Sequence, residues 1–264
     1  MRLPGLARYR SSSAGAKEPR LQAPAIDCPA RHRGRNLAWL LWLPLAAVQA
    51  DGLGGSVGVA TDDVFRGVSE SEGQLSPRGE LHGMLGSWFA GASAEEVRIG
   101  FGGHAGAELV AYAGFQHDIG EQWTAQISAR HYDYYPGSNY RARYNYDEAG
   151  LSLGWQQRIV VSAIASPDTY RHDYQGNFGS GSAYAYEVGA RQPLPLGLVA
   201  NLGAGWYDLR HQIGAGYAYW NAGISRRWSS WAADLRYVGT DGTARYHFED
   251  DAGDRVVFSL FWTF

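Results

Sequence analysis

Residues 256–264 (VVFSLFWTF) carry one apolar side chain at every second position. These are Val256, Phe258, Leu260, Trp262 and Phe264, and the chain ends on the last of them. A period of two places all five side chains on one face of a β-strand. Such a face either meets lipid, as in an outer-membrane barrel, or is buried in a soluble sheet, and this strand alone leaves both interpretations open.

The opposite end of the chain has the pattern of a secretory signal peptide. Arginines between residues 31 and 35 precede the apolar run 37–47 (LAWLLWLPLAA), and small residues follow up to Ala50. The run is shorter than the roughly 18 residues that a membrane-spanning helix needs. We expect cleavage after Ala50, so that residues 1–50, an N-terminal extension plus the signal peptide, are removed and 51–264 form the folded domain.

The predicted mature chain is acidic and contains neither lysine nor cysteine. Residues 51–264 include 15 arginines and 24 carboxylates, a formal net charge of −9, while Lys17 and Cys28 precede the expected cleavage point. Nucleic-acid binding needs basic clusters, so we expect no nucleic-acid partner. We likewise expect no disulfide, no thiolate nucleophile and no cysteine-based metal site.

Short alternating runs separated by Gly, Asp, Asn and Pro clusters indicate strands and turns throughout this domain. An even number of strands is expected when both ends of an antiparallel barrel lie on one side of a membrane. The fold class predicted is therefore all-β, a transmembrane antiparallel up-and-down β-barrel of about twelve strands. The strands expected are 55–62, 79–86, 88–94, 106–116, 123–133, 146–155, 158–166, 184–192, 198–207, 217–227, 231–239 and 255–264.

The links between these strands alternate between tight and long. The tight links are 86–87, 118–122, 156–157, 193–197 and 228–230. The long, polar links are 63–78, 95–105, 134–145, 167–183, 208–216 and 240–254. Outer-membrane barrels sort their links in this way, with short periplasmic turns and long external loops.

The strands also carry one apolar and one polar face. Strand 123–133, for example, has Ile127 among small apolar residues on one face and Arg130 among polar residues on the other. In a membrane barrel the apolar face is turned outward; a soluble lipocalin-like barrel reverses the faces and gives the same alternation.

Aromatic residues gather at the strand ends. Their apolar rings with polar tips suit the headgroup level of a bilayer, so they predict two girdles. The tight-turn girdle would contain Trp88, Trp123, Trp155, Trp228 and Trp231. The loop-end girdle would contain Tyr132, Tyr134, Trp206 and Tyr207.

Two stretches carry resemblances to known patterns. The alternating residues Val256, Phe258, Leu260, Trp262 and Phe264 resemble the terminal signal by which the bacterial barrel-assembly machinery recognises its clients. Residues 62–71 (DDVFRGVSES) resemble a segment of the TorF family of outer-membrane porins, with the matching positions Asp62, Phe65, Arg66, Gly67 and Ser69. Asp63 departs from that pattern, because the family usually has an aromatic residue there.

The TorF resemblance implies a barrel in the bacterial outer membrane, surrounded by lipid, that passes small solutes passively. It supplies no catalytic residues. Nothing in the sequence indicates a cofactor, a bound metal ion or an oligomeric state.

Ionisable side chains on the predicted inner face mix acids and bases. They could line an aqueous path and set its ion preference, or form salt bridges that plug the barrel. Glycines on the inner face, such as Gly114, Gly205 and Gly223, leave room and favour the path. The lumen-lining candidates are Glu80, Glu108, Arg130, Glu148, Glu187, Arg191, Asp234, Arg236 and Arg255.

Two other functions are weighed against a pore. Some barrels of this size are hydrolases, but no His–Ser spacing stands out here as a nucleophile–base pair. A structural or adhesive barrel with functional external loops remains the main alternative. The acidic cluster from Glu249 to Asp254 lacks the spacing of a calcium loop and is interpreted as a solvated loop.

Overall fold

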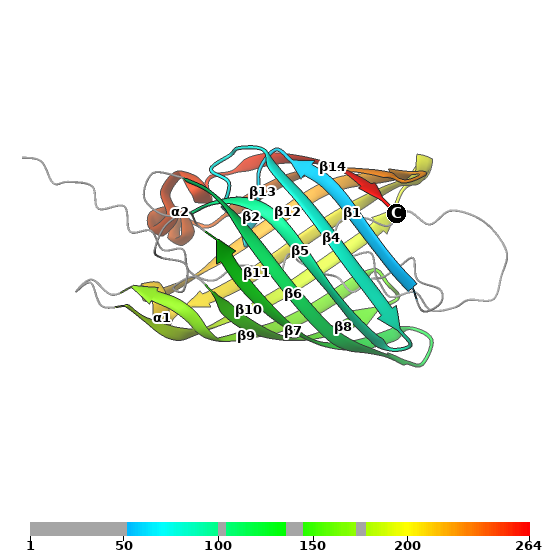
Figure 1. Cartoon of the computed structure of the whole chain (residues 1–264), viewed down its shortest axis with the longest axis horizontal. Coiled ribbons are helices and arrows are strands. Elements are labelled where there is room, and N and C mark those ends of the chain that lie inside the picture. The colour runs from blue at the N-terminus through cyan, green and yellow to red at the C-terminus, as the bar shows by residue number, and fades with distance from the viewer. Residues whose placement is uncertain (1–51, 100–103, 136–144, 173–177) are drawn as a thin grey trace, which may run out of the picture.

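Twelve antiparallel strands form a closed barrel in which each strand pairs with its neighbours in chain order (Figure 1). The computed structural model describes residues 52–99, 104–135, 145–172 and 178–264, so the leader and its cleavage point lie outside the described residues. The prediction of a twelve-stranded transmembrane barrel is confirmed. The barrel strands are β1 (Gly52–Ala60), β4 (Ser76–Leu85), β5 (Trp88–Ile99), β6 (His104–Ile119), β7 (Trp123–Tyr135), β8 (Tyr146–Trp155), β9 (Ile159–His172), β10 (Phe178–Pro193), β11 (Leu198–Leu209), β12 (Ala215–Trp228), β13 (Trp231–Thr240) and β14 (Arg255–Thr263).

The last strand closes the barrel by pairing with the first. β14 pairs with β1 in a register that runs from Ser56 opposite Thr263 to Ala60 opposite Ser259. The backbone N–H groups of Gly55 and Phe264 donate to each other's carbonyl oxygens at 3.0 and 3.1 Å. Because lipid offers no hydrogen bonds to an open edge, this closure is what a membrane barrel requires.

Several strands extend beyond their predicted limits at the long-loop end. β9 runs to His172 and β10 begins at Phe178, and these two residues pair with each other. Residues 167–172 and 178–183 show no apolar alternation, because this part of the hairpin is built by backbone hydrogen bonds, which any residue type except proline can donate. A register shift between Gly181 and Ala183 marks a bulge in the same hairpin.

The tight links lie together at the end of the barrel where β1 begins and the chain ends (Figure 1). They include the turn at Gln156 and Gln157, both with positive φ (48° and 56°), and the short 3-10 helix η2 (Pro195–Gly197). Two consecutive residues with positive φ match the right-handed twist of the flanking strands.

The opposite end carries the folded parts of the long loops. These are the two-stranded hairpin β2 (Val64–Phe65) and β3 (Val68–Ser69), the helices α1 (Arg210–Ile213) and α2 (Gly242–Phe248), and the 3-10 helix η3 (Glu249–Ala252). Asp241 caps α2 by accepting hydrogen bonds from the backbone N–H groups of Thr243 and Ala244. Within the described part of the chain, no helix is long and apolar enough to cross a membrane.

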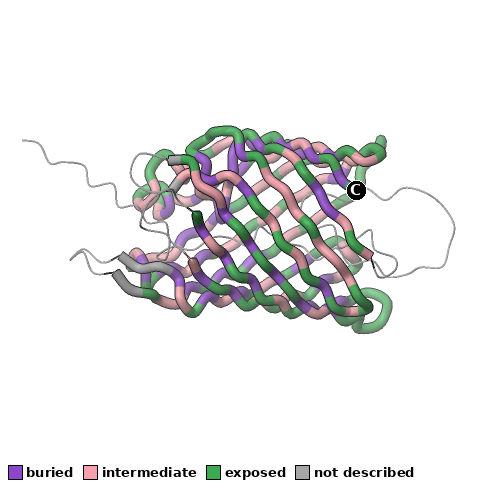
Figure 2. Tube along the Cα trace, viewed as in Figure 1, coloured by how far each residue is buried: buried purple, intermediate pink, exposed green. Residues whose placement is uncertain are grey.

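Along most strands, buried or half-buried residues alternate with exposed ones, as expected when successive side chains point to opposite surfaces of the wall (Figure 2). On β14, Val256, Phe258, Trp262 and Phe264 are exposed on the outer surface, while Val257 and Phe261 are buried inside. The outer surface is therefore apolar, as the predicted orientation of the faces requires.

The aromatic residues of the tight-turn end follow the prediction, but three of the four at the loop end do not. Trp88, Trp123, Trp228 and Trp231 are exposed on the outer surface. Tyr132, Tyr134 and Tyr207 instead point inward and are buried, and only Trp206 faces out. The prediction was wrong for these tyrosines because polar partners and packing inside the lumen hold their rings there.

Candidate functional site

All nine ionisable residues proposed to line the lumen occupy inward-facing positions of their strands. Five of them are buried and the other four are partly exposed. The structure brings Arg130, Glu148 and Glu187 into one cluster, whereas Asp234 pairs separately with Arg236, with 2.8 Å between Oδ1 and Nε. The remaining four lie elsewhere on the inner face: Glu80, Glu108, Arg191 and Arg255.

The centre of the cluster is a residue from a loop rather than from the wall. The loop between β1 and β4 folds into the barrel as the β2–β3 hairpin, whose two turn residues are Arg66 and Gly67. Both have positive φ (41° and 83°), the geometry of a type I′ turn. A Cβ built at Gly67 would lie only 2.3 Å from Cγ2 of Thr240 on β13, so the close approach of hairpin and wall requires glycine.

Arg66 is held by acidic and aromatic side chains from four strands. Its Nη2 lies 3.3 Å from Oε1 of Glu148 on β8, and its Nε lies 3.7 Å from Oε1 of Glu187 on β10. Its guanidinium carbon lies 4.1 Å from the ring centroid of Tyr207 on β11. The hydroxyl of Tyr219 on β12 donates to Glu187 at 2.6 Å. The Arg66 side chain is only 1% exposed, so the cluster closes around it.

Arg66 carries a firmly held positive charge. Burial lowers its pKa, but the facing Glu148 carboxylate, together with Tyr207, Tyr219 and Glu187, outweighs that effect and raises the pKa of Arg66 well above its ordinary value. The arginine therefore remains protonated and neutralises part of the acidic wall.

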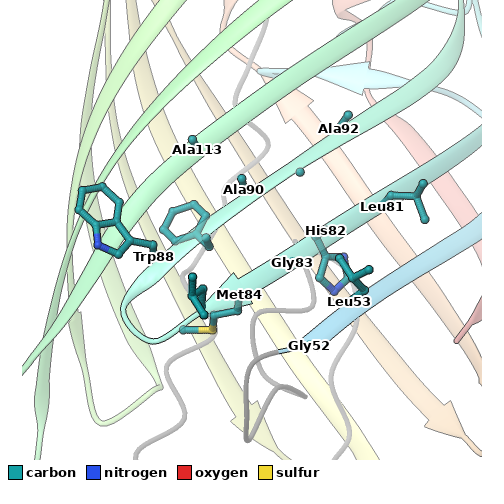
Figure 3. A pocket seen from close by; sticks show the side chains of 13 residues that line it. Gly52, Leu53, Leu81, His82, Gly83, Met84, Trp88, Ala90, Ala92 and Ala113 are labelled. Atoms are coloured by element: carbon teal, nitrogen blue, oxygen red, sulfur yellow. The ribbon is translucent and has the colours of Figure 1, made fainter.

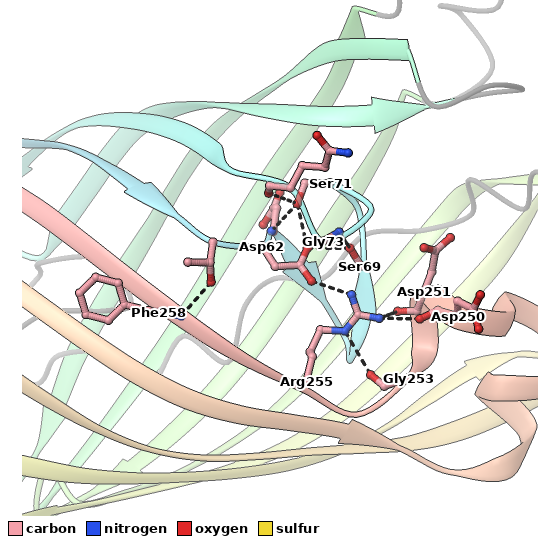
Figure 4. Close-up of polar contacts among 12 residues, drawn as sticks. Asp62, Ser69, Ser71, Gly73, Asp250, Asp251, Gly253, Arg255 and Phe258 are labelled. Atoms are coloured by element: carbon pink, nitrogen blue, oxygen red, sulfur yellow. Dashed lines mark hydrogen bonds and ion pairs between the residues drawn. The ribbon is translucent and has the colours of Figure 1, made fainter.

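The base of the hairpin is fixed by a compact set of short hydrogen bonds (Figure 4). Oδ1 of Asp62 accepts from the hydroxyls of Ser69 at 2.6 Å and Ser71 at 2.8 Å. Its Oδ2 lies 2.6 Å from Nη1 of Arg255 on β14. Nη2 of Arg255 donates to the backbone oxygens of Asp250 and Asp251, at 2.8 and 2.6 Å. Arg255 thus joins the hairpin to the loop that carries η3.

Apolar side chains complete the packing at this end. Phe65 on β2 belongs to a buried cluster with Tyr207, Tyr217 and Tyr219, which Ala244 of α2 and Ala252 of η3 also join. The hairpin and the α2–η3 loop therefore fill the loop end of the lumen together.

Other inward carboxylates also have partners. The hydroxyls of Tyr112 and Tyr134 donate to Glu80 and Glu108, the first at 2.6 Å. Glu95 lies 3.3 Å from Nη2 of Arg78. The acidic groups of the lumen are thus stabilised by hydroxyl and guanidinium donors rather than left as bare charges.

The inner-face glycines do not leave open space in the way we expected. Gly205 lies opposite Tyr219 in the β11–β12 register, and a Cβ there would lie 2.3 Å from the tyrosine ring. Gly114 accommodates Phe89 in the same way, and Gly223 accommodates the stem of Arg236. These positions are small because neighbouring side chains lie across them.

The two ends of the lumen therefore differ. Around the hairpin the inward side chains are almost all buried, whereas in the half nearer the tight turns buried residues such as Thr124, Val160 and Phe261 are interspersed with partly exposed polar ones. The polar residues of this tight-turn half include Ser128, Ser152, Ser162, Asn201, Asn221, Arg191 and Arg227.

The TorF-like segment 62–71 was recognised from the sequence, but no structural role was predicted for its matching residues. These are Asp62, Phe65, Arg66, Gly67 and Ser69. Residues 63–78 were expected to be an external loop, whereas the hairpin lies inside the barrel. An Arg-Gly pair flanked by Phe65 and Val68 is a short hairpin signal that could have revealed the turn. The sequence contains nothing comparable that identifies Glu148 and Glu187, on distant strands, as partners of the arginine.

Other features lie outside the lumen or lack catalytic geometry. Residues 150–154 (GLSLG) match the Gly-x-Ser-x-Gly pattern of a nucleophile elbow, but they lie within strand β8 rather than at a strand-to-helix turn. The hydroxyl of Ser152 contacts another serine, with 2.9 Å between Ser152 Oγ and Ser162 Oγ. Nδ1 of His131 lies 2.8 Å from Asp147, but both side chains face outward. In the ranges that the structure describes, no group of three or more His, Cys, Asp or Glu side chains could hold a metal ion.

A surface depression of about 740 Å³ lies near the tight-turn end (Figure 3). The exposed side chains of Leu53, Leu81, Leu85 and Trp88 border it, and Ala90, Ala92 and Ala113 line it between them. Its outward apolar side chains belong to the lipid-facing wall rather than to the polar lumen.

The fold is a closed, porin-like antiparallel β-barrel. The chain belongs to a bacterial family of proteins of unknown function, Gcw_chp, whose model matches residues 47–264. No curated protein matches the sequence.

Two solved porins share the architecture at very low sequence identity. A NanC porin is 9% identical with a TM-score of 0.51, and the match covers 80% of this chain and 98% of that one. A KdgM porin, solved in complex with disordered oligogalacturonate, is 7% identical with a TM-score of 0.50 and the same coverage. At these identities the similarity concerns the fold alone.

Proposed function

We propose that this protein is an outer-membrane porin through which small hydrophilic solutes or ions pass passively. The observation that carries the proposal is the polar inner face of a closed barrel, on which carboxylates such as Glu80, Glu148 and Glu187 are paired with hydroxyl or guanidinium groups. Such a face serves no purpose in lipid and would be costly if it were merely buried.

The proposed path has two parts. The partly exposed polar residues near the tight turns, Arg191 among them, would line a vestibule, and the ionisable residues of the loop half together with the hairpin would form the narrow part. The resemblance of residues 62–71 to the TorF porins points to the same function. The porin-like fold favours a channel over an enzyme.

The proposal includes a route to the membrane. We infer export with cleavage after Ala50, recognition of the terminal strand by the barrel-assembly machinery, and a final position in outer-membrane lipid. The proposal is supported by the exposed apolar side chains on the outer face of β14, which suit both recognition by the assembly machinery and contact with lipid. They are those of Val256, Phe258 and Trp262.

Planar-bilayer recordings of purified, refolded protein test the proposal. The wild type is compared with a trimmed variant in which residues 64–69 are replaced by a Gly-Ser linker. We expect discrete single-channel currents, larger and more frequent in the trimmed variant. A trimmed barrel that migrates as folded on unheated gels yet carries no current at any voltage would exclude the pore.

One observation favours the second candidate, a non-conducting structural or adhesive barrel with functional external loops. The side chains of Arg66 and Glu148 are each 1% exposed, so the loop end is filled in this conformation. Absence of current from the trimmed variant would leave this alternative as the better account.

A further inference from the structure

The β2–β3 hairpin combines a strongly fixed base with a more weakly held tip. Three contacts of 2.6–2.8 Å hold Asp62 at the base. At the tip, the two ion pairs of Arg66 measure 3.3 and 3.7 Å, and its buried Nε has no hydrogen-bond partner. Arg66 also adopts a left-handed backbone conformation, which is unfavourable for a residue with a side chain.

The surface behind the tip is suited to water. It is formed by the carboxylates of Glu148 and Glu187, the guanidinium of Arg130 and the hydroxyls of Tyr132 and Tyr219. An apolar plug would need an apolar wall, and apolar packing is commonly at least as stable as a buried ion cluster. A wall of hydratable groups is instead stable both with the tip in place and with water in its position.

From this asymmetry we propose that the β2–β3 hairpin is a hinged plug. Its base stays attached through Asp62 and Arg255, while its Arg66 tip leaves the Glu148–Glu187 site to open the loop end of the lumen. This inference depends on the proposed pore. The apolar contacts of Phe65 stabilise the closed state, so the open state is the minor one.

A reversible tether tests whether the tip must move. Positions 67 and 240 are close enough for a disulfide, because a Cβ at Gly67 lies 2.3 Å from Thr240 Cγ2. The double variant Gly67→Cys/Thr240→Cys would contain the only cysteines after Cys28. We expect no current from the oxidised double variant and recovery after reduction with dithiothreitol, while Thr240→Cys alone conducts in both conditions.

A second variant tests the latch without a cross-link, in case the tethered protein does not fold. Arg66→Ala removes the charge that holds the tip and leaves two facing carboxylates, so the fraction of time spent open should rise several-fold. Arg66→Lys should lie between this variant and the wild type. Arg245→Ala, which breaks an exposed ion pair with Asp254 on the outer loop, is the matched control and should behave as wild type.

Two results would overturn the plug. One is an oxidised tether, verified by mass spectrometry, that conducts as well as its reduced form. The other is an Arg66→Ala barrel whose open time equals that of the wild type. Either result would rule out the hinged plug but would still be compatible with passive passage through the barrel. A folded trimmed variant that carries no current would instead contradict the pore itself. The failure of the plug and the failure of the pore can therefore be distinguished.

Discussion

At the scale of single residues, the lumen is organised by glycines that lie opposite aromatic rings. Gly205 faces Tyr219, Gly91 faces Tyr112 and Gly114 faces Phe89 across adjacent strands. Each glycine lets the ring lie flat over the backbone of the next strand. Because the hydroxyl of Tyr219 bonds to Glu187, the glycine at 205 also helps to position a partner of Arg66.

Replacing this glycine should therefore destabilise the barrel. In Gly205→Ala the new methyl group would overlap the Tyr219 ring, and overpacking of this kind costs roughly 1–3 kcal/mol. Urea unfolding of the refolded protein in micelles, followed by tryptophan fluorescence, measures the loss. Gly189→Ala is the control, since its nearest neighbouring atom is 4.0 Å away. Equal stability of the two variants would contradict this role of the glycine.

At the scale of elements, β14 combines an apolar outer face with the closure of the barrel. Its outward face carries the apolar alternation, and its backbone joins β13 to β1. Phe264 contributes the final pair of backbone hydrogen bonds, to Gly55, and its ring packs 4.9 Å from that of Trp262.

Deletion of Phe264 should lower the amount of folded protein in the outer membrane. The deletion removes both hydrogen bonds to Gly55 and the terminal aromatic residue of the proposed assembly signal. Immunoblots of membrane fractions, with heated and unheated samples, measure folded barrel. Phe264→Tyr keeps the backbone and the ring and should assemble like the wild type. A normal level of the deleted protein would show that the last residue is dispensable.

At the scale of the whole molecule, charge is distributed unevenly along the lumen. The loop half contains Glu80, Glu108, Glu148 and Glu187 with their partners. The tight-turn half contains the partly exposed Arg191 and Arg227, besides Asp234, which pairs with Arg236. Arg227 donates to the hydroxyl oxygen of Thr263 at 3.0 Å and pairs with no carboxylate among the described residues. In the proposed pore, its charge would therefore be available to anions.

This distribution predicts the ion preference of the open pore. Arg227→Gln should shift the reversal potential in a KCl gradient toward cations, because it removes a positive charge from the vestibule. Arg226→Gln on the neighbouring outward-facing position is the control and should leave the reversal potential unchanged. If both variants match the wild type, the vestibule charge does not govern selectivity.

Much of the barrel could be predicted from residues 51–264. The alternation of Val256 to Phe264, the sorted tight and long links and the tryptophans at the tight turns are local or periodic features. A period of two fixes which side chains share a face, and pairing rules then fix the neighbours of each strand. For the same reason the inward positions of Glu148, Glu187 and Arg130 followed from strand register.

The tertiary structure alone decided what fills the lumen. Arg66, Glu148 and Glu187 are far apart in the chain, and no periodic signal relates a loop residue to two strands. The inward turn of Tyr132 and Tyr207 depends on the same cluster, so the expected loop-end girdle was wrong. The wall of the barrel could be read from residue order, because a wall is built from repeated local geometry. The plug depends on where a non-repeating loop finds complementary charge and apolar packing, and this emerges only when the closed barrel brings distant strands together.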